Sequence, residues 1–339
     1  MSKKKDDDAL FQAIEELDLS KLGGDGPSVV STSFPQLDAI FGRGGLATGK
    51  IYEVAGEPGT WKSVFLYKLI AEAQKTYPDK KAYLFDTEMV VQGKEDLEWI
   101  KSHGVDISPD RFAVIQGMVL EDMFNKMLEV GSDTNTCFIG LDSIGIMTNV
   151  VNANAKRFER DDKNKIKDDR LGMFAKATGS AVQLLATAIA RNHILMVVVN
   201  QVRDNVSMYG GGAFVTPGGK KYKHNLSGRI EFYQKEILKK GDEVMGAIIK
   251  VIVKRSKISA AGQTDESNHL KFFIKGAEFQ EAYNLFDQAV EKGIIIKAGA
   301  WLKAKALDRT WQGQEKILAE LESNEELREE LKELIKNAS

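Results

Sequence analysis

The chain has 339 residues, of which 43% are hydrophobic and 28% charged, and its 47 Lys and Arg nearly balance its 49 Asp and Glu. This composition is typical of a folded globular protein and excludes collagen-like and wholly disordered chains, and the length allows about two domains. The net charge of -2 excludes a strong positive field over the whole molecule, so any binding of nucleic acid must depend on local basic patches.

The cysteine content and the length of the apolar runs indicate in which cellular compartment the protein resides. The single cysteine, Cys137, excludes an internal disulfide and a cysteine-rich zinc site, and it indicates a reducing environment. Apolar runs such as 194–199 are far too short to cross a bilayer, and the charged residues 1–8 lack the apolar stretch of a secretory signal. We therefore predict a cytoplasmic protein with no membrane partner.

Residues 1–29 are predicted to form an N-terminal arm and linker. An amphipathic helix is expected over residues 9–22, and the glycine-rich stretch 23–28 is typical of a flexible connection. The apolar side of this helix needs a cover, which is either the chain's own core or a neighbouring copy of the chain. Its members are Leu10, Phe11, Ile14 and Leu17.

Residues 30–275 alternate short apolar or β-branched runs with stretches of helical periodicity. This alternation predicts βαβ units and a mostly parallel sheet buried on both faces, so the predicted fold class is α/β. The predicted strands are 51–55, 82–85, 137–141, 194–199, 248–253 and 271–274, and the predicted helices are 63–76, 94–103, 120–130 and 171–192.

Residues 276–339 are predicted to form a small, separate C-terminal α/β domain. Apolar residues between Tyr283 and Val290 recur at helical spacing, and Gly293 ends that pattern. One strongly charged helix is expected over residues 315–336.

A glycine-containing turn stands directly between the strand predicted at 51–55 and the helix predicted at 63–76. A strand, such a turn, a Lys-Ser pair and a helix N-terminus together form a P-loop, whose backbone N–H groups bind phosphate. We expect Lys62 to meet the β- and γ-phosphate oxygens and the Ser63 hydroxyl to ligate Mg²⁺. From this motif alone, a turn with an incidental Lys-Ser pair is the alternative. The turn consists of Gly56, Glu57, Pro58, Gly59, Thr60, Trp61, Lys62 and Ser63.

Trp61 stands where a P-loop usually has glycine, directly before the lysine. Because a bulky residue disfavours a positive φ, we expect either a compatible negative φ at this position or a weaker nucleotide affinity.

Polar residues follow three other predicted strands, at the edge where open α/β sheets bind ligands. Asp142 is a candidate to hold Mg²⁺ through water. Glu88 is a candidate general base for an attacking water, with a solvated surface acid as the alternative. The neutral amide of Gln201 suits a sensor that binds the γ-phosphate and loses that bond on hydrolysis.

Several short stretches beyond the P-loop complete a recognisable pattern: 31–33, 37–38, 44–46, 85–88, 104–106, 141–143, 200–203, 218–219 and 297–301. The chain resembles the RecA family of DNA strand-exchange recombinases over nearly its whole length. The stretch 297–301 lies outside the ATPase core and makes the resemblance specific to RecA. The aromatic residue before the P-loop lysine resembles the phage UvsX-like branch, which implies a bacterial or phage-infected cell.

The resemblance assigns roles in ATP hydrolysis residue by residue. Lys62 and Ser63 are implied to bind phosphate and Mg²⁺, and Asp142 is implied to be the acid that holds the metal. Glu88 is implied to be the catalytic glutamate, and Gln201 the sensor of the γ-phosphate.

Further contacts to the nucleotide are implied less directly. Lys223, Arg255 and Lys257 are implied to approach the nucleotide of a neighbouring protomer. Asp96 and Trp99 are the candidates for contacts with adenine.

The resemblance also implies two DNA-binding loops, over residues 148–170 and 203–219. The second combines cations and apolar residues with glycines, which suits sequence-independent binding of single-stranded DNA. The first is mixed in charge, so a solvated surface segment is its alternative interpretation. The DNA-contacting candidates are Arg170, Lys176, Arg203, Met208, Tyr209, Phe214, Gly218, Gly219 and Lys220.

What the resemblance implies is an ATP-dependent recombination and repair protein with ATP and Mg²⁺ as cofactors. Such a protein forms a helical filament on single-stranded DNA, pairs it with homologous duplex DNA and exchanges strands. Its partners are these DNAs, further copies of the chain and loading or mediator proteins. Two alternatives stay open, a RecA-like motor or regulatory ATPase, and a non-catalytic coat of single-stranded DNA whose site Trp61 has weakened.

Overall fold

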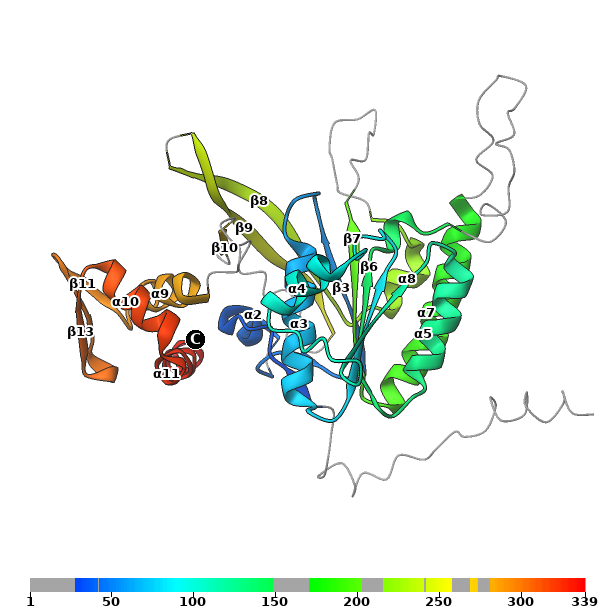
Figure 1. Cartoon of the computed structure of the whole chain (residues 1–339), viewed down its shortest axis with the longest axis horizontal. Coiled ribbons are helices and arrows are strands. Elements are labelled where there is room, and N and C mark those ends of the chain that lie inside the picture. Colours follow the sequence, from blue (N-terminus) through cyan, green and yellow to red (C-terminus); the bar gives the residue numbers. More distant parts are fainter. Residues whose placement is uncertain are drawn as a thin grey trace, which may run out of the picture.

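The structure is a computed structural model that describes residues 28–41, 43–148, 171–202, 216–240, 242–257, 269–273 and 281–338 (Figure 1). Most of the predicted N-terminal arm therefore lies outside the described residues, as do 149–170 and 203–215 of the two predicted DNA-binding loops. None of the helices among the described residues is long and apolar enough to span a membrane.

One large sheet with helices on both sides organises the chain before residue 274 (Figure 1). In chain order the elements of this part of the chain are β1 (Val29–Val30), α2 (Pro35–Ile40), β2 (Leu46–Ala47), β3 (Lys50–Gly56), α3 (Lys62–Thr76), β4 (Lys81–Asp86), α4 (Lys94–Ser102), β5 (Phe112–Gln116), α5 (Leu120–Gly131), β6 (Thr136–Asp142), α7 (Leu171–Arg191), β7 (Leu195–Gln201), α8 (Gly219–Asn225), β8 (Gly228–Lys240), β9 (Glu243–Ser256) and β10 (His269–Phe273). Strands β1 and β2 pair with each other in a separate two-stranded sheet.

The large sheet has eight strands in the order β10-β9-β8-β3-β7-β6-β4-β5. Every pair from β8 to β5 is parallel, whereas β9 and β10 continue the sheet with antiparallel pairs. Helices α3 and α4 lie on one face, and α5 and α7 cover the other (Figure 1). The predicted α/β class with a mostly parallel sheet is confirmed.

Burial on both faces explains why the central strands form continuous apolar runs. Val54 and Val197 pack in the hydrophobic cluster that contains α3, while Ile51 and Val198 pack in the cluster that contains α5 and α7. Because successive side chains of a strand point to opposite faces, a strand between two helical layers has no polar side. Parallel strands also place all their carboxyl ends at one edge, and the polar residues that follow them meet there.

The sequence pattern predicts no strand over β8, yet this strand is one of the longest in the sheet. Only residues 228–232 lie beside β3, and the rest of β8 pairs with β9 alone. In this outer part Gln234, Glu236 and Ile237 are all exposed, so the sequence lacks the alternation by which a half-buried strand is recognised.

The C-terminal residues form a small antiparallel sheet with its own hydrophobic cluster. Phe286, Leu321 and Leu331 are buried in this cluster. The elements are α9 (Glu281–Glu291), β11 (Ile296–Ala298), β12 (Trp301–Ala304), β13 (Arg309–Gln312), α10 (Gln314–Ser323) and α11 (Glu325–Asn337).

The single helix expected over residues 315–336 is wrong, because α10 and α11 are separated at Asn324. This residue is extended, with φ -115° and ψ 100°, and its side chain accepts a hydrogen bond from the Leu327 N–H at 3.0 Å. An asparagine competes for backbone hydrogen bonds and so favours a helix start over a helix interior. The break lets Leu318 of α10 and Leu331 of α11 enter the same cluster.

We expect Asn324→Ala to loosen the start of α11, because alanine cannot accept the hydrogen bond from Leu327. Loss of such a cap costs about 1 kcal/mol, so amides in the first turn of α11 should exchange about fivefold faster by hydrogen-exchange mass spectrometry. Asn324→Asp keeps an acceptor oxygen and should exchange like the wild type. Equal exchange in the alanine variant would show that the cap does not stabilise this helix.

Candidate functional site

The turn between β3 and α3 depends on two glycines for different reasons. At Gly56 a Cβ atom would lie 2.4 Å from the backbone oxygen of Phe232, so only glycine fits beside β8. Gly59 has a φ of +75°, which glycine adopts without a steric cost. The Thr60 hydroxyl donates a hydrogen bond to the Glu57 carbonyl oxygen at 2.7 Å, which stabilises the turn.

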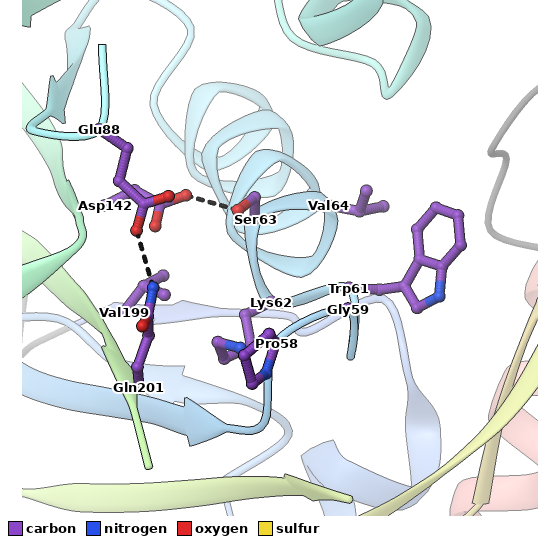
Figure 2. A pocket seen from close by; sticks show the side chains of 10 residues that line it. All are labelled: Pro58, Gly59, Trp61, Lys62, Ser63, Val64, Glu88, Asp142, Val199 and Gln201. Atoms are coloured by element: carbon purple, nitrogen blue, oxygen red, sulfur yellow. Dashed lines mark hydrogen bonds between the residues drawn. The ribbon is translucent and has the colours of Figure 1, made fainter. Parts of the chain in front are cut away.

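Trp61 adopts a left-handed backbone conformation, with φ 63° and ψ 26°, directly before α3. Of the two alternatives expected at this position, the negative φ is excluded, and a weaker nucleotide affinity stays a prediction. The turn keeps a conformation suited to glycine, at a cost of roughly 1–2 kcal/mol for a residue with a side chain. The indole packs, partly buried, against the hydrophobic cluster on the α3 face, and Figure 2 shows it directed away from Ser63 and Asp142. This packing offsets part of the backbone strain.

The Lys62 ammonium lies inside the turn. It donates to the Glu57 carbonyl oxygen at 2.6 Å and to the Thr60 hydroxyl at 3.4 Å. Burial lowers the pKa of Lys62, and the nearby carboxylates of Asp142, Glu88 and Glu57 oppose that shift. A cation is thus held at the point where a P-loop binds the terminal phosphates.

Ser63 and Asp142 join the first turn of α3 to the end of β6. The Ser63 hydroxyl donates to Asp142 Oδ2 at 2.6 Å (Figure 2). Burial raises the pKa of Asp142 to about 6; the Ser63 hydrogen bond and Lys62 lower it, while Glu88 and Asp86 raise it. A hydroxyl beside a carboxylate offers the hard oxygen ligands that Mg²⁺ prefers, so Ser63 and Asp142 are the residues that would hold this ion.

Glu88 and Gln201 face each other across the pocket. Glu88 Oε1 accepts from the Gln201 amide at 3.1 Å (Figure 2). The same oxygen accepts from the Ser143 hydroxyl at 2.8 Å. The Gln201 amide is therefore engaged by the carboxylate in this structure. A phosphate oxygen entering between them would offer the amide a second acceptor.

The residues around Glu88 hold its position, a role that sequence reasoning missed. The Thr87 hydroxyl donates to the Ser143 carbonyl oxygen at 2.7 Å and accepts from the Ser143 N–H at 2.8 Å. Asp86 Oδ2 accepts from the Val91 N–H and the Gln116 amide, both at 2.9 Å. Asp86 ends β4 and holds the segment that follows it, whereas Glu88 lines the pocket. The position of Ser143 directly after Asp142 is the sequence feature that could have indicated its role.

These side chains line a pocket of about 390 Å³ at the carboxyl edge of the parallel strands, within the size range of small-molecule sites. The described residues contain no cluster of three or more His, Cys, Asp or Glu that could hold a metal ion by itself. A metal here would depend on the phosphates of a bound nucleotide for its remaining ligands. The lining residues are Pro58, Gly59, Trp61, Lys62, Ser63, Val64, Glu88, Asp142, Val199 and Gln201.

Asp96 and Trp99 lie on α4 and do not line this pocket. Asp96 Oδ2 accepts from the N–H groups of Gln92 and Gly93, at 2.8 and 2.9 Å, and so caps its own helix. The Trp99 ring packs edge-on against His103, with centroids 4.7 Å apart. Within one chain both side chains are used in local structure.

Lys223, Arg255 and Lys257 also lie away from the pocket of their own chain. Lys223 is near the end of α8, and Arg255 is in β9, where its backbone pairs with Arg229. Lys257 is exposed and donates to the His224 carbonyl oxygen at 2.7 Å.

Four of the candidate DNA contacts can be placed. Gly218 and Gly219 have φ of 110° and 74° and lead into α8, where Lys220 is exposed. Lys176 is exposed on the neighbouring helix α7. The remaining candidates, Arg170, Arg203, Met208, Tyr209 and Phe214, lie outside the described residues.

Comparison with known proteins covers both parts of the chain. The family model of the RecA N-terminal domain matches residues 18–273, and that of the RecA C-terminal domain matches residues 283–339. The chain belongs to the RecA family. Proteins named RecA from Staphylococcus aureus strains JH9 and Newman are each 27% identical over 310 residues, which cover 90% of this chain and 81% of theirs. At the family level, RecA proteins are DNA-dependent ATPases of recombination and repair.

The positive φ of Trp61 predicts a difference between two small replacements. Trp61→Gly and Trp61→Ala both remove the indole, but only glycine adopts this conformation without strain. We expect the glycine variant to be more stable than the alanine variant by roughly 1–2 kcal/mol, since the left-handed conformation strains the folded turn by about that amount. Equal free energies of unfolding, measured by urea denaturation, would show that the backbone at position 61 is not strained.

The raised pKa of Asp142 predicts a pH dependence. With a pKa of about 6, the carboxyl group is mostly protonated at pH 5 and ionised at pH 7. Because a cation requires the ionised form, affinity for Mg-ATP should rise about tenfold between these values. Asp142→Asn cannot ionise and should show only the dependence that comes from the nucleotide's own phosphates. Identical profiles for the two proteins, measured by calorimetry, would contradict this role.

Proposed function

We propose that this chain is an ATP-dependent recombinase that forms a helical filament on single-stranded DNA, pairs it with homologous duplex DNA and exchanges strands. The observation that carries the proposal is the convergence of Lys62, Ser63, Asp142, Glu88 and Gln201 in one pocket. The family matches over both domains support it, because a general P-loop protein would match only the core.

In this proposal the turn 56–63 holds ATP by its phosphates. The backbone N–H groups and Lys62 bind the β- and γ-phosphates, while Ser63 and Asp142, the latter through water, hold Mg²⁺. Glu88 accepts the proton of the attacking water, a contribution worth roughly 10² to 10⁴ in rate.

Gln201 reports whether the terminal phosphate is present. Its amide already faces the pocket and binds Glu88 at 3.1 Å. When it exchanges this acceptor for a phosphate oxygen, the end of β7 changes its contacts, and residue 202 leads directly into the segment proposed to bind DNA. Hydrolysis then reverses the exchange, so ATP favours the DNA-bound filament and ADP favours release.

Filament assembly accounts for the residues outside the pocket. Lys223, Arg255 and Lys257 act on the nucleotide of the adjacent protomer, and Asp96 and Trp99 remain the candidates for adenine. The arm over 9–22 docks on a neighbour in a head-to-tail contact, which propagates as a helix. Lys176, Gly218, Gly219 and Lys220, together with the loops that they flank, form the DNA surface, and pairing between strands supplies the sequence choice.

The two alternatives differ from this proposal in measurable ways. A motor would unwind a forked duplex with one polarity. A non-catalytic coat would bind DNA without DNA-stimulated phosphate release. The hydrogen-bonded Glu88 and the intact turn at Trp61 favour hydrolysis over the coat.

Two substitutions test the proposed chemistry. Lys62→Ala should lose ATP binding, turnover and strand exchange together. Glu88→Gln should still bind ATP but hydrolyse it about 10² to 10⁴-fold more slowly, because only the proton acceptor is lost. Phosphate release and strand exchange between a circular single strand and a linear duplex measure both effects.

Electron microscopy with ATP and a long single strand provides the control on assembly. The wild type and Glu88→Gln should form helical filaments, and Lys62→Ala should not. Wild-type strand exchange by Lys62→Ala would show that the phosphate site has been assigned to the wrong turn.

A further inference from the structure

A group of charged side chains on β3, β8 and β9, most of them buried, takes no part in the proposed chemistry. Glu53 lies in β3, three residues before the turn, and is fully buried. Its Oε1 accepts from the Asn200 amide at 2.7 Å, and its Oε2 lies 3.3 Å from Nε of Arg229. These contacts join three neighbouring strands, β3, β7 and β8, from inside the sheet.

The charges in this group balance. Arg229 Nε also lies 2.9 Å from Glu231 Oε1, and the half-exposed Lys254 ammonium lies 4.0 Å from Glu231 Oε2. Two carboxylates therefore face two cations. A buried ion group of this kind is often no more stabilising than apolar residues of the same volume, so stability alone does not explain its presence.

The group connects the two ends of the segment 203–215. At one end, Asn200 immediately precedes Gln201, whose amide binds Glu88 in the pocket. At the other end, the Asn200 amide lies 3.2 Å from the Pro217 carbonyl oxygen, and Arg229 donates to the Thr216 hydroxyl at 3.2 Å. Thr216 is itself buried. One carboxylate, Glu53, thus positions the amide and the guanidinium that hold these two ends together.

We propose that Glu53 and Arg229 are positioning residues that couple Gln201 to residues 216–217 and thereby link ATP turnover to DNA binding. This inference rests on the proposed function, in which the segment between these residues binds DNA. A shift of Gln201 toward a phosphate moves Asn200, whose acceptor Glu53 is ion-paired with Arg229 through its other oxygen. The Arg229 contact to Thr216 then responds without any contact between the nucleotide and DNA. The chain of contacts is continuous, as coupling through a packed interior requires.

Neither Glu53 nor Arg229 lines the pocket, so a substitution there can change the coupling without changing catalysis directly. Glu53→Gln keeps the shape of the side chain and its contact with Asn200 but removes the charge opposite Arg229. We expect ATP affinity and turnover without DNA to stay at wild-type values. The stimulation of turnover by single-stranded DNA should fall about tenfold, within the usual range for coupling between two sites.

The control for charge loss is Glu236→Gln, in the same strand as Arg229 but exposed, and it should behave as wild type. The variant Glu53→Gln with Arg229→Gln removes both members of the Glu53–Arg229 pair and serves if the single variant does not fold. A purely structural ion pair predicts that the double variant recovers DNA stimulation along with thermal stability. Coupling predicts that stability recovers while stimulation stays low.

Three assays on the same proteins test the coupling: binding of fluorescent ATP, phosphate release without DNA, and phosphate release with single-stranded DNA. Full DNA stimulation in folded Glu53→Gln, or recovery in the double variant, would overturn the inference while leaving the proposed function in place. A wild-type protein that DNA does not stimulate would instead contradict the proposed function, and the inference with it.

Discussion

The hydrogen bond from Ser63 to Asp142 joins the first turn of α3 to the end of β6, and the whole pocket is arranged around it. It forms because β3 and β6 run parallel in one sheet, with β7 between them, so that their carboxyl ends open at the same edge. Glu88 and Gln201 reach that edge from β4 and β7. Residues far apart in the chain thus become neighbours because parallel strands place their carboxyl ends at the same edge of the sheet.

Several features of this edge lower the stability of the fold, and each lies in or beside the pocket. Trp61 holds a left-handed conformation, Lys62 is buried, and Asp142 has a raised pKa because burial disfavours its charged form. The apolar core of the sheet compensates for them, since strands such as β3 and β7 are buried along nearly their whole length. Strain and buried charge of this kind are usual where a site is organised before its ligand arrives.

The buried pair of Glu53 and Arg229 extends this organisation away from the nucleotide. The end of β7 has two sets of contacts, one to Glu88 through Gln201 and one to Pro217 through Asn200, and Glu53 holds the Asn200 amide. An element that is held from two sides changes both sets together when it moves. In the proposed function, loss of the terminal phosphate in the pocket changes the contacts of residues 216–217, which flank the DNA-binding segment.

Local pattern by itself determined the α/β class, the central strands and the turn 56–63, because periodicity and glycine position are properties of neighbouring residues. It named Glu88 as the candidate base, but it could not find the roles of Asp86, Ser143, Glu53 and Arg229. Those roles depend on contacts across strands that are distant in the chain. Packing explains three features that the local pattern did not predict. The left-handed backbone at Trp61 accompanies an indole that packs on the core, and the break at Asn324 lets two helices share the C-terminal cluster. The strand β8 pairs with a partner strand, β9. Tertiary contacts override local preference wherever the energy of burial exceeds the cost of an unusual conformation.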